Sequence, residues 1–242
     1  MDSLEAQLRA LGRKELPESL GLDGRLFRLE RTFQHRFATA VGLYACGEER
    51  VVCKVHRRAS LFGLPLEGAG RLMAAYETAV LAKLQGIPGV PTLRRSPLPA
   101  AVVREFVPGE PLHTSTRVGD QFFPELLALL RRIHERGLAY VDMEKPENIL
   151  VGEDGRPYLF DFQIAFYVPR RALGETTLVR AVRGWFQRGD HYHAMKHFRK
   201  VRCDLLSEEQ VAAIRRRPLA VHVGNVLMAP LRLVKMALRR KT

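Results

Sequence analysis

The chain has 242 residues, 46% of them hydrophobic, and carries a formal net charge of +13 at pH 7. This length predicts one domain of two lobes or two small domains, with a core that needs no covalent cross-links. The three cysteines, Cys46, Cys53 and Cys203, are scattered and form no C-x-x-C pair, which argues against a disulfide framework and a structural zinc site.

The N-terminal stretch resembles neither a signal peptide nor a membrane anchor. Residues 3–13 mix acids and bases at helical spacing and predict a short helix, without the long apolar run of a signal peptide. No run of 18 uncharged apolar residues occurs along the chain, which argues against a membrane-spanning helix. We therefore expect a cytoplasmic protein.

The first half of the chain reads as strands around one helix. Residues 25–57 are rich in Phe, Val, Tyr and Thr and break at Gly42 and at 46–49, which predicts three strands, the clearest being VVCKV at 51–55. Helical periodicity runs from Leu72 to Leu84 and stops before Gly86. Residues 92–107 predict two further strands.

The second half begins near Pro108–Leu112, where we expect a boundary between lobes. PELLALLRRIHER (124–136) is strongly amphipathic and is followed by Gly137, the residue that commonly ends a helix. A loop, NILV, a turn and YLFDF come next, so a helical segment is followed by a β-hairpin.

Phosphoryl transfer from ATP needs a cation on the phosphates, an acid that holds this cation, metal ligands, and a carboxylate near the acceptor hydroxyl. The sequence has a candidate for each, in this order: Lys54 in a strand, Glu77 on the following helix, Asp142 and Asn148 after the second helix, and Asp161 in LFDFQ. Taken singly, a strand lysine or a helix glutamate is usually solvated, and an aspartate after a helix often caps it. The ordered set is what indicates a nucleotide site.

These segments together resemble the protein-kinase superfamily over about residues 28–166. VVCKV resembles the V-A-I-K strand, YETAVLAKLQGIPGVP the helix with the pairing glutamate, REFVPGEPL the hinge, IHERGLAYVDMEKPENILV the catalytic loop, and YLFDFQ the D-F-G segment. The resemblance implies an α+β fold of two lobes, with an antiparallel N-lobe sheet and a reduced, mainly helical C-lobe. The implied division is an N-terminal helical extension at 1–24, an N-lobe at 25–108, a C-lobe at 109–220 and a basic amphipathic segment at 221–242.

The same resemblance implies ATP and Mg²⁺ as cofactors and gives each motif residue a role. Lys54 contacts the ATP phosphates, and Glu77 holds Lys54. Asp142 is the catalytic base and Lys145 assists it. The implied magnesium ligands are Asn148 and Asp161, and the implied nucleotide contacts in the hinge and the phosphate-covering loop are Glu105, Val107, His35 and Arg36.

The spacing of the catalytic loop departs from the family. The pattern H-R-D-x-x-x-x-N puts four residues between Asp and Asn, whereas five separate Asp142 from Asn148. Counting back five from Asn148 reaches Met143, which cannot accept a proton. The candidates for the base are therefore Asp142, with one inserted residue, and Glu144.

Two observations favour Asp142. In an extended YVDMEK segment, Asp142 and Glu144 share one side, but Asp142 adjoins the strand-like stretch that fixes its position. The 13 positions from Asn148 to Asp161 agree with the superfamily. A one-residue bulge between base and metal ligand is the simplest interpretation.

Other departures concern the phosphate-covering loop and the length of the C-lobe. Residues 31–42 hold a single glycine, Gly42, Gln163 replaces the glycine of D-F-G, and no A-P-E follows in the 81 residues after Asp161. These departures argue against an ordinary protein kinase with its long activation segment. The short C-lobe with its basic C-terminal region most resembles the bacterial kinases that phosphorylate sugars of the lipopolysaccharide core. Those kinases are compact and cytoplasmic and act at the membrane face.

The positive charge is concentrated in the C-terminal third. Residues 162–242 hold 17 of the 39 Lys and Arg but only 5 of the 26 Asp and Glu, which favours a polyanionic partner over a merely solvated face. Residues 221–242 could lie on an anionic membrane surface or pack on the fold. The lack of interleaved exposed aromatics argues against nucleic acid. Asp190, His193 and His197 share a helical face, for which a solvated face or an acceptor-lining face is a better interpretation than a metal site.

We therefore predict an ATP- and magnesium-dependent phosphotransferase with a hydroxyl acceptor. The favoured acceptor is a sugar of lipopolysaccharide or another anionic envelope glycolipid, at the inner face of the membrane. A protein Ser or Thr is the second candidate. A nucleotide-binding pseudokinase or membrane-associated scaffold is the alternative from another class, favoured by the missing glycines and opposed by the intact motif residues.

Overall fold

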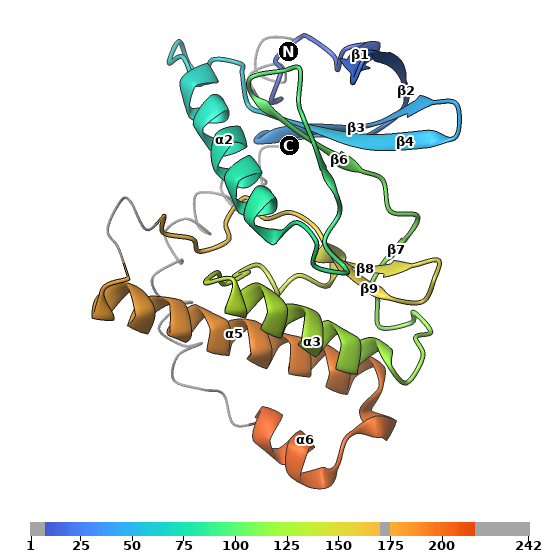
Figure 1. The fold of residues 1–242 in the computed structure, drawn as a ribbon, viewed down its shortest axis with the longest axis vertical. Coiled ribbons are helices and arrows are strands. Elements are labelled where there is room, and N and C mark those ends of the chain that lie inside the picture. The colour runs from blue at the N-terminus through green and yellow to red at the C-terminus, as the bar shows by residue number, and fades with distance from the viewer. Residues whose placement is uncertain (1–7, 170–174, 216–242) are drawn as a thin grey trace. The chain divides into compact units, whose positions relative to one another are not determined.

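The first part of the chain forms an antiparallel sheet with one helix on it (Figure 1). The computed structural model describes residues 8–169 and 175–215. Within these residues six strands take the order β1-β2-β3-β4-β6-β5, and every neighbouring pair is antiparallel. The strands are β1 (Ser19–Leu22), β2 (Arg25–His35), β3 (Thr39–Cys46), β4 (Glu49–His56), β5 (Leu93–Arg94) and β6 (Ala101–Glu105).

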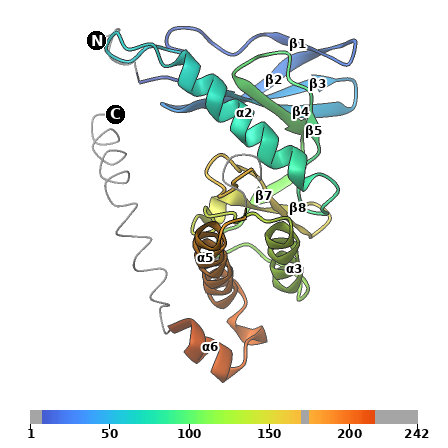
Figure 2. The ribbon, with the colours of Figure 1, turned by 60° about the vertical axis from the view of Figure 1, so that its left-hand side comes forward.

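Both faces of the sheet are covered at β4, one by the hydrophobic core and the other by a helix. Successive side chains of a strand point to opposite faces, and Val51, Cys53 and Val55 join the hydrophobic core with Phe27 and Tyr44. The alternate positions of β4, which include Lys54, therefore point to the other face. The helix that follows β4 packs on this strand and on β6 (Figures 1 and 2).

This helix, α2 (Glu67–Leu84), begins five residues before the periodicity that starts at Leu72. Its early turns are poor in large apolar residues because the backbone of Gly70 lies against the end of β4. A Cβ at Gly70 would come 2.0 Å from the carbonyl oxygen of Arg57. Only a residue without a side chain allows this approach. The first turns of α2 therefore lack the apolar periodicity by which a helix is recognised in a sequence.

A second sheet has the order β7-β8-β9 and corresponds to the predicted hairpin region. Its strands are β7 (Gly109–Pro111), β8 (Ile149–Gly152) and β9 (Pro157–Leu159). Gly109, at φ +153°, is needed here because a Cβ would lie 2.2 Å from the carbonyl oxygen of Val151. The close pairing thus depends on glycine at the start of β7.

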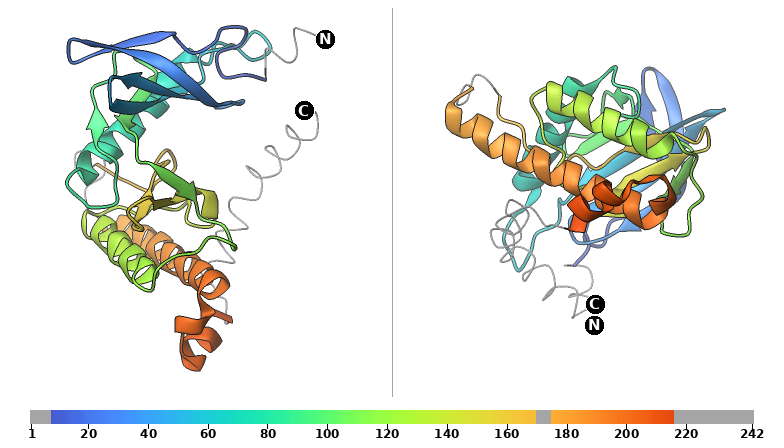
Figure 3. Two further views of the ribbon diagram at one scale, coloured as in Figure 1. Left: turned by 90° about the vertical axis from the view of Figure 1, so that its right-hand side faces the viewer. Right: turned by 90° about the horizontal axis from the view of Figure 1, so that it is seen from below.

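The chain divides into two units. The first takes in the described residues up to Glu110 together with Leu150–Ile164, and the second takes in Pro111–Ile149 and the described residues from Ala165 on. The second unit contains the long helices α3 (Phe122–Glu135) and α5 (Thr177–Val201), which lie side by side (Figures 2 and 3). Short helices η1 (Pro146–Asn148), η2 (Cys203–Leu205) and α6 (Glu208–Arg215) complete it.

Helices α3 and α5 pack through apolar faces. The stripe that the sequence predicts over 124–136 is buried and includes Leu126, Leu129 and Ile133. The ring of Phe123 stacks on that of Phe198 from α5, with centroids 4.6 Å apart. The first turn of α5 is closed by Thr176, whose hydroxyl accepts the backbone N–H of Val179.

The α+β fold, the three strands over 25–57 and the helix near 124–136 are confirmed. The strand break expected at Gly42 is wrong, because Gly42 lies within β3 and pairs with Cys53, and the chain turns at residues 36–38 instead. The helix expected over 3–13 is wrong for its described part, because residues 8–13 form turns. There the backbone N–H of Ala10 donates to Arg36, and the carbonyl of Ala10 accepts two N–H groups from residues 58 and 59. Tertiary hydrogen bonds thus replace the helical ones. Residues 221–242 lie outside the described residues.

Candidate active site

Lys54 lies in an ion-pair cluster in the first unit. Its Nζ is 3.0 Å from Oε2 and 3.1 Å from Oε1 of Glu77, which projects from α2. Glu77 is 3% exposed, and its Oε2 also lies 2.9 Å from Nε2 of His56. Because His56 follows Lys54 by two residues in β4, both side chains lie on the sheet face that α2 covers.

Asp161 completes this cluster from the segment after β9. Its Oδ1 accepts a hydrogen bond from Nζ of Lys54 at 2.6 Å. The backbone of Asp161 has φ +69°, a left-handed conformation that few residues other than glycine adopt. The next residue, Phe162, is fully buried. A buried ring after a left-handed turn fixes the direction of the Asp161 side chain.

The electrostatics of the cluster favour its charged forms. Burial lowers the pKa of Lys54, but the charges of Glu77 and Asp161 outweigh this effect and leave the pKa above its usual value. Burial likewise raises the pKa of Glu77, while the charge of Lys54 and the hydrogen bond from His56 bring it below its usual value. Lys54 is therefore a cation and Glu77 an anion at neutral pH.

A second cluster lies in the loop between α3 and β8, in the second unit. Oδ2 of Asp142 accepts hydrogen bonds from Nζ of Lys145 and, at 2.8 Å, from Nδ2 of Asn148. Nδ2 of Asn148 also lies 3.3 Å from the carbonyl oxygen of Asp142. Asp142 and Asn148 are both buried. The structure thus brings together the three residues that the sequence assigned to this loop.

Helix α5 holds this loop in a strained conformation. Val141 has φ +71°, which is unusual for a β-branched residue and costs about 1–3 kcal/mol. The carboxylate of Asp190 accepts the backbone N–H groups of Tyr140 and Val141, both at 2.7 Å, and a hydrogen bond from His134 at 2.9 Å. These three bonds offset the strain and position the residue next to Asp142.

His197, two turns further along α5, supports the inserted residue. Its Nε2 lies 2.9 Å from the carbonyl oxygen of Met143, whose side chain is fully buried. Burial lowers the pKa of His197, so the ring is neutral and donates this hydrogen bond. The extra residue in the loop is therefore accommodated by a fixed backbone and a buried side chain.

The geometry distinguishes the two candidates for the base. The extended YVDMEK run is wrong, because Val141 adopts a left-handed conformation. Asp142 is 6% exposed and faces Asn148, whereas Glu144 is exposed. Asp142 is therefore the one of the two with a fixed position beside the proposed metal ligand.

His35 contacts the N-terminal segment. Its Nε2 accepts the backbone N–H of Leu11 at 3.1 Å, and its Nδ1 lies 3.3 Å from Oε2 of Glu15. Burial lowers the pKa of His35, and the charge of Arg9 acts in the same direction. These contacts give His35 a structural role; its contact with phosphate stays a prediction.

The other expected nucleotide contacts occupy a turn and a strand end. Arg36 is exposed between β2 and β3, where its N–H donates to the carbonyl of Thr39. Glu105 ends β6 with its Oε1 3.5 Å from Nη1 of Arg94. Val107 follows in the link to β7 and is half-buried. Their roles stay predictions.

The donor types of Asn148 and Asp161 fit magnesium. Because Nδ2 of Asn148 donates to Asp142, its Oδ1 is the atom available as a ligand. Mg²⁺ uses one or two carboxylates and amide oxygens together with nucleotide phosphates. In the described ranges, no group of three or more His, Cys, Asp or Glu could hold a metal alone. The sequence suggested that Asp190 and His197 lie on a solvated or an acceptor-lining face of the helix. In the structure both are buried, and both hold the catalytic loop.

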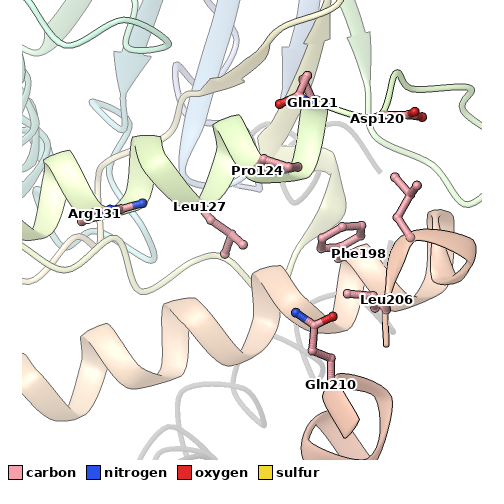
Figure 4. Close-up of a pocket in the computed structure, with 9 residues that line it drawn as sticks. Asp120, Gln121, Pro124, Leu127, Arg131, Phe198, Leu206 and Gln210 are labelled. Atoms are coloured by element: carbon pink, nitrogen blue, oxygen red, sulfur yellow. The ribbon is translucent and has the colours of Figure 1, made fainter. Parts of the chain in front are cut away.

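A separate cavity of about 530 Å³ lies in the second unit, along α3, α5, η2 and α6 (Figure 4). None of the expected site residues lines it. Its lining residues are Asp120, Gln121, Pro124, Leu127, Arg131, Phe198, Leu205, Leu206 and Gln210.

Among the described residues, no helix combines the length and hydrophobicity needed to cross a bilayer.

Sequence reasoning did not assign His56, His134 or the loop contacts of Asp190. The signal for His56 was available, since alternation places it on the face of Lys54. The contact between His134 and Asp190 joins residues 56 positions apart, and no local pattern indicates such a pair.

Comparison with known proteins shows similarity to protein kinases. No family model matches the chain. A protein kinase of Oryza sativa is 36% identical over 92 residues, which are 34% of this chain and 15% of that protein. A serine/threonine-protein kinase of Arabidopsis thaliana is 34% identical over 106 residues, 38% of this chain and 18% of that protein. The chain therefore spans less than a fifth of the length of these relatives.

Two solved structures share the fold at low sequence identity. The Rio2 kinase–ADP/Mg²⁺–phosphoaspartate complex of Chaetomium thermophilum aligns with a TM-score of 0.53 and 19% identity, over 74% of this chain and 57% of that one. The kinase domain of BubR1 aligns with a TM-score of 0.53 and 15% identity, over 78% and 66%. The fold is that of protein kinases, and about a third of the chain is similar in sequence to known protein kinases.

Proposed function

We propose that the protein is an ATP- and magnesium-dependent phosphotransferase that acts on a hydroxyl group. The observation that carries the proposal is Lys54, a cation with a side chain only 12% exposed that contacts both Glu77 and Asp161. A lysine held by a helix glutamate and an aspartate after a β-hairpin is the arrangement that kinases use to bind nucleotide phosphates and metal. The kinase fold and the kinase relatives support it.

Each cluster supplies part of the chemistry. Lys54 binds phosphate oxygens, and Asn148 and Asp161 hold Mg²⁺, which neutralises phosphate charge. Asp142 orients the acceptor hydroxyl and accepts its proton, while Lys145, which contacts Asp142, offsets the charge beside it. Phosphoryl transfer requires both clusters to act on one nucleotide, and this is part of the proposal. Glu105 and Val107 contact the adenine ring of ATP, and Arg36 assists in binding its phosphates.

The charge of α5 favours an anionic acceptor. Asp190 is the one acidic residue in this 25-residue helix, and it is buried. Lys196 and Lys200 act electrostatically on His197, which contacts the catalytic loop. Cations beside this loop would attract a phosphate-bearing acceptor. We therefore favour a sugar hydroxyl of lipopolysaccharide or another anionic envelope glycolipid, with residues 221–242 on the inner membrane surface.

A protein Ser or Thr hydroxyl is the second candidate acceptor. It is favoured by the Arabidopsis thaliana relatives, which are serine/threonine-protein kinases by name. A pseudokinase that binds nucleotide without transfer is the alternative from another class. The intact Lys54, Asp142 and Asp161 oppose this alternative.

A thermal-shift measurement with ATP and Mg²⁺ tests nucleotide binding. At 100 times its dissociation constant, a ligand stabilises the folded protein by about 2.7 kcal/mol. We expect a shift with ATP that increases on adding Mg²⁺. The absence of any shift at millimolar ATP and Mg²⁺ would contradict the proposed function.

Sedimentation with vesicles tests the glycolipid acceptor. We expect binding to anionic but not neutral vesicles, with loss of binding at high salt. Deletion of residues 221–242 should weaken vesicle binding without changing ATP affinity. A protein that stays in the supernatant under every condition would favour the protein acceptor.

A further inference from the structure

His56 is an unexpected polar residue in the cluster around Lys54. Its side chain is 4% exposed, and Nε2 lies 2.9 Å from Oε2 of Glu77. We propose that His56 is a positioning residue, which fixes the carboxylate of Glu77 and, through it, directs Lys54 toward the nucleotide phosphates. This inference rests on the proposed ATP-dependent function and adds a residue that none of the kinase motifs above contains.

The carboxylate of Glu77 is held from two directions. Lys54 approaches both of its oxygens, at 3.1 and 3.0 Å, and His56 approaches Oε2 alone. A carboxylate only accepts hydrogen bonds, so Nε2 of His56 carries the hydrogen in this contact. Without His56, both oxygens of this buried carboxylate would depend on Lys54 alone, and the carboxylate could rotate with the lysine.

Lys54 needs Glu77 as a fixed partner because Asp161 has two proposed roles, as an acceptor for Lys54 and as a magnesium ligand. Asp161 accepts from Lys54 at 2.6 Å and is also the proposed magnesium ligand. Its side chain is 26% exposed, compared with 3% for Glu77. Glu77 is therefore the partner that holds Lys54 when Asp161 binds metal, and the position of Glu77 determines where the lysine points.

The backbone of His56 is itself fixed. Its N–H donates to the carbonyl of Ala100 at 2.8 Å, and Thr39 lies opposite it in β3. The carbonyl of the next residue, Arg57, touches α2 at Gly70. Gly70 and Glu77 are seven residues apart, about two helical turns, and lie on the same face of α2. The end of β4 thus contacts α2 at two points.

A purely structural role explains the histidine poorly. An aliphatic side chain would fill a buried position without the cost of removing an imidazole from water. A histidine is retained at lower cost only where its N–H finds an acceptor, and here the acceptor is the residue that holds Lys54. The role is therefore directed at the ion pair.

The test compares ligands with and without phosphate. Dissociation constants for Mg·ATP and for adenosine are measured by calorimetry on the full chain with His56→Leu, His56→Gln and the wild type. His56→Leu should weaken Mg·ATP binding by about tenfold, the value of a hydrogen bond to a charged group, and leave adenosine binding unchanged. His56→Gln, which keeps an N–H donor of similar reach, should restore affinity to within about threefold of the wild type.

Two further variants separate positioning from stability. Val55→Ala removes core packing from the opposite face of β4 and should lower Tm without changing the ratio of the two dissociation constants. Adding His56→Leu to Glu77→Gln should cause little further loss, since His56 acts through Glu77. If His56→Leu does not fold, His56→Asn, whose amide is too short to reach Glu77, replaces it.

The outcomes distinguish this inference from the proposed function. If the wild type binds Mg·ATP but His56→Leu and His56→Asn retain the wild-type ratio, or weaken both ligands equally, the inference is overturned and the proposed function stands. If the wild type does not bind Mg·ATP, the proposed function is overturned and the inference with it.

Discussion

Nζ of Lys54 donates a hydrogen bond of 2.6 Å to Oδ1 of Asp161, although 107 positions separate the two residues in the chain. The contact joins β4 to the segment that follows β9, both in the first unit. The short distance and the low exposure of the lysine side chain, 12%, make this a strong, charge-assisted bond. It is the link between the proposed phosphate-binding cation and the proposed metal ligand.

Replacing Asp161 with Asn should remove the magnesium dependence of nucleotide binding. Asn has nearly the same shape and tolerates the left-handed backbone at this position, so the fold should be retained. The neutral amide is a much weaker ligand for Mg²⁺ than a carboxylate. Thermal shifts with ATP, with and without Mg²⁺, measure the effect. A full magnesium-dependent shift in Asp161→Asn would show that this residue is not the metal ligand.

The two acidic residues of the catalytic loop should respond differently to neutralisation. Asp142→Asn should keep nucleotide affinity but reduce phosphoryl transfer by about 10²–10⁴-fold, the usual contribution of a general base. Glu144→Gln should retain most of the activity, because Glu144 is exposed and Asp142 is buried beside Asn148. Turnover rates of the two variants under saturating ATP decide the question. The opposite ranking would assign the base to Glu144.

Two glycines of α2 provide a matched test of helix packing. Alanine normally stabilises a helix by about 1 kcal/mol relative to glycine, and Gly68→Ala should do so or be neutral because its Cβ meets nothing within 4 Å. Gly70→Ala should instead destabilise the protein by about 1–3 kcal/mol, since its Cβ would lie 2.0 Å from the carbonyl oxygen of Arg57. Urea denaturation measures both. Equal effects would refute this contact.

The stability of the protein should fall as the pH is lowered, in part through His197. Burial lowers the pKa of His197 in the folded state, whereas the unfolded chain has a pKa of about 6.5. Below about pH 6.5 the unfolded state therefore binds a proton that the folded state excludes, and this residue decreases stability by at most about 1.4 kcal/mol per pH unit.

His197→Gln keeps a donor to Met143 but removes the titration. Its Tm should fall less than that of the wild type between about pH 7 and pH 5.5. His35 and His191, whose pKa values are also lowered by burial, contribute equally to both proteins. Parallel pH profiles would argue against a neutral, buried His197.

Parts of this architecture could be predicted from the sequence because they depend on local patterns. Alternation in VVCKV placed Lys54 on one face of a strand, and the amphipathic stripe over 124–136 gave α3. Strand β1 was not predicted, because SLGL is only four residues long and contains glycine. The left-handed conformation of Val141 could not be foreseen, because it is stabilised by Asp190, about 50 positions away. Local propensity disfavours it, and only tertiary hydrogen bonds outweigh that preference.

The most direct test of the proposed phosphotransferase is transfer of labelled γ-phosphate from ATP. The protein is incubated with Mg·ATP and either an anionic envelope glycolipid or a mixture of protein substrates, with Lys54→Met as the control. We predict magnesium-dependent incorporation of label by the wild type into one of these acceptors, favouring the glycolipid, and at least a 100-fold loss in Lys54→Met, about the scale of removing one preorganised cation from developing charge. Binding of Mg·ATP without incorporation into either acceptor would contradict the phosphotransferase and support a pseudokinase.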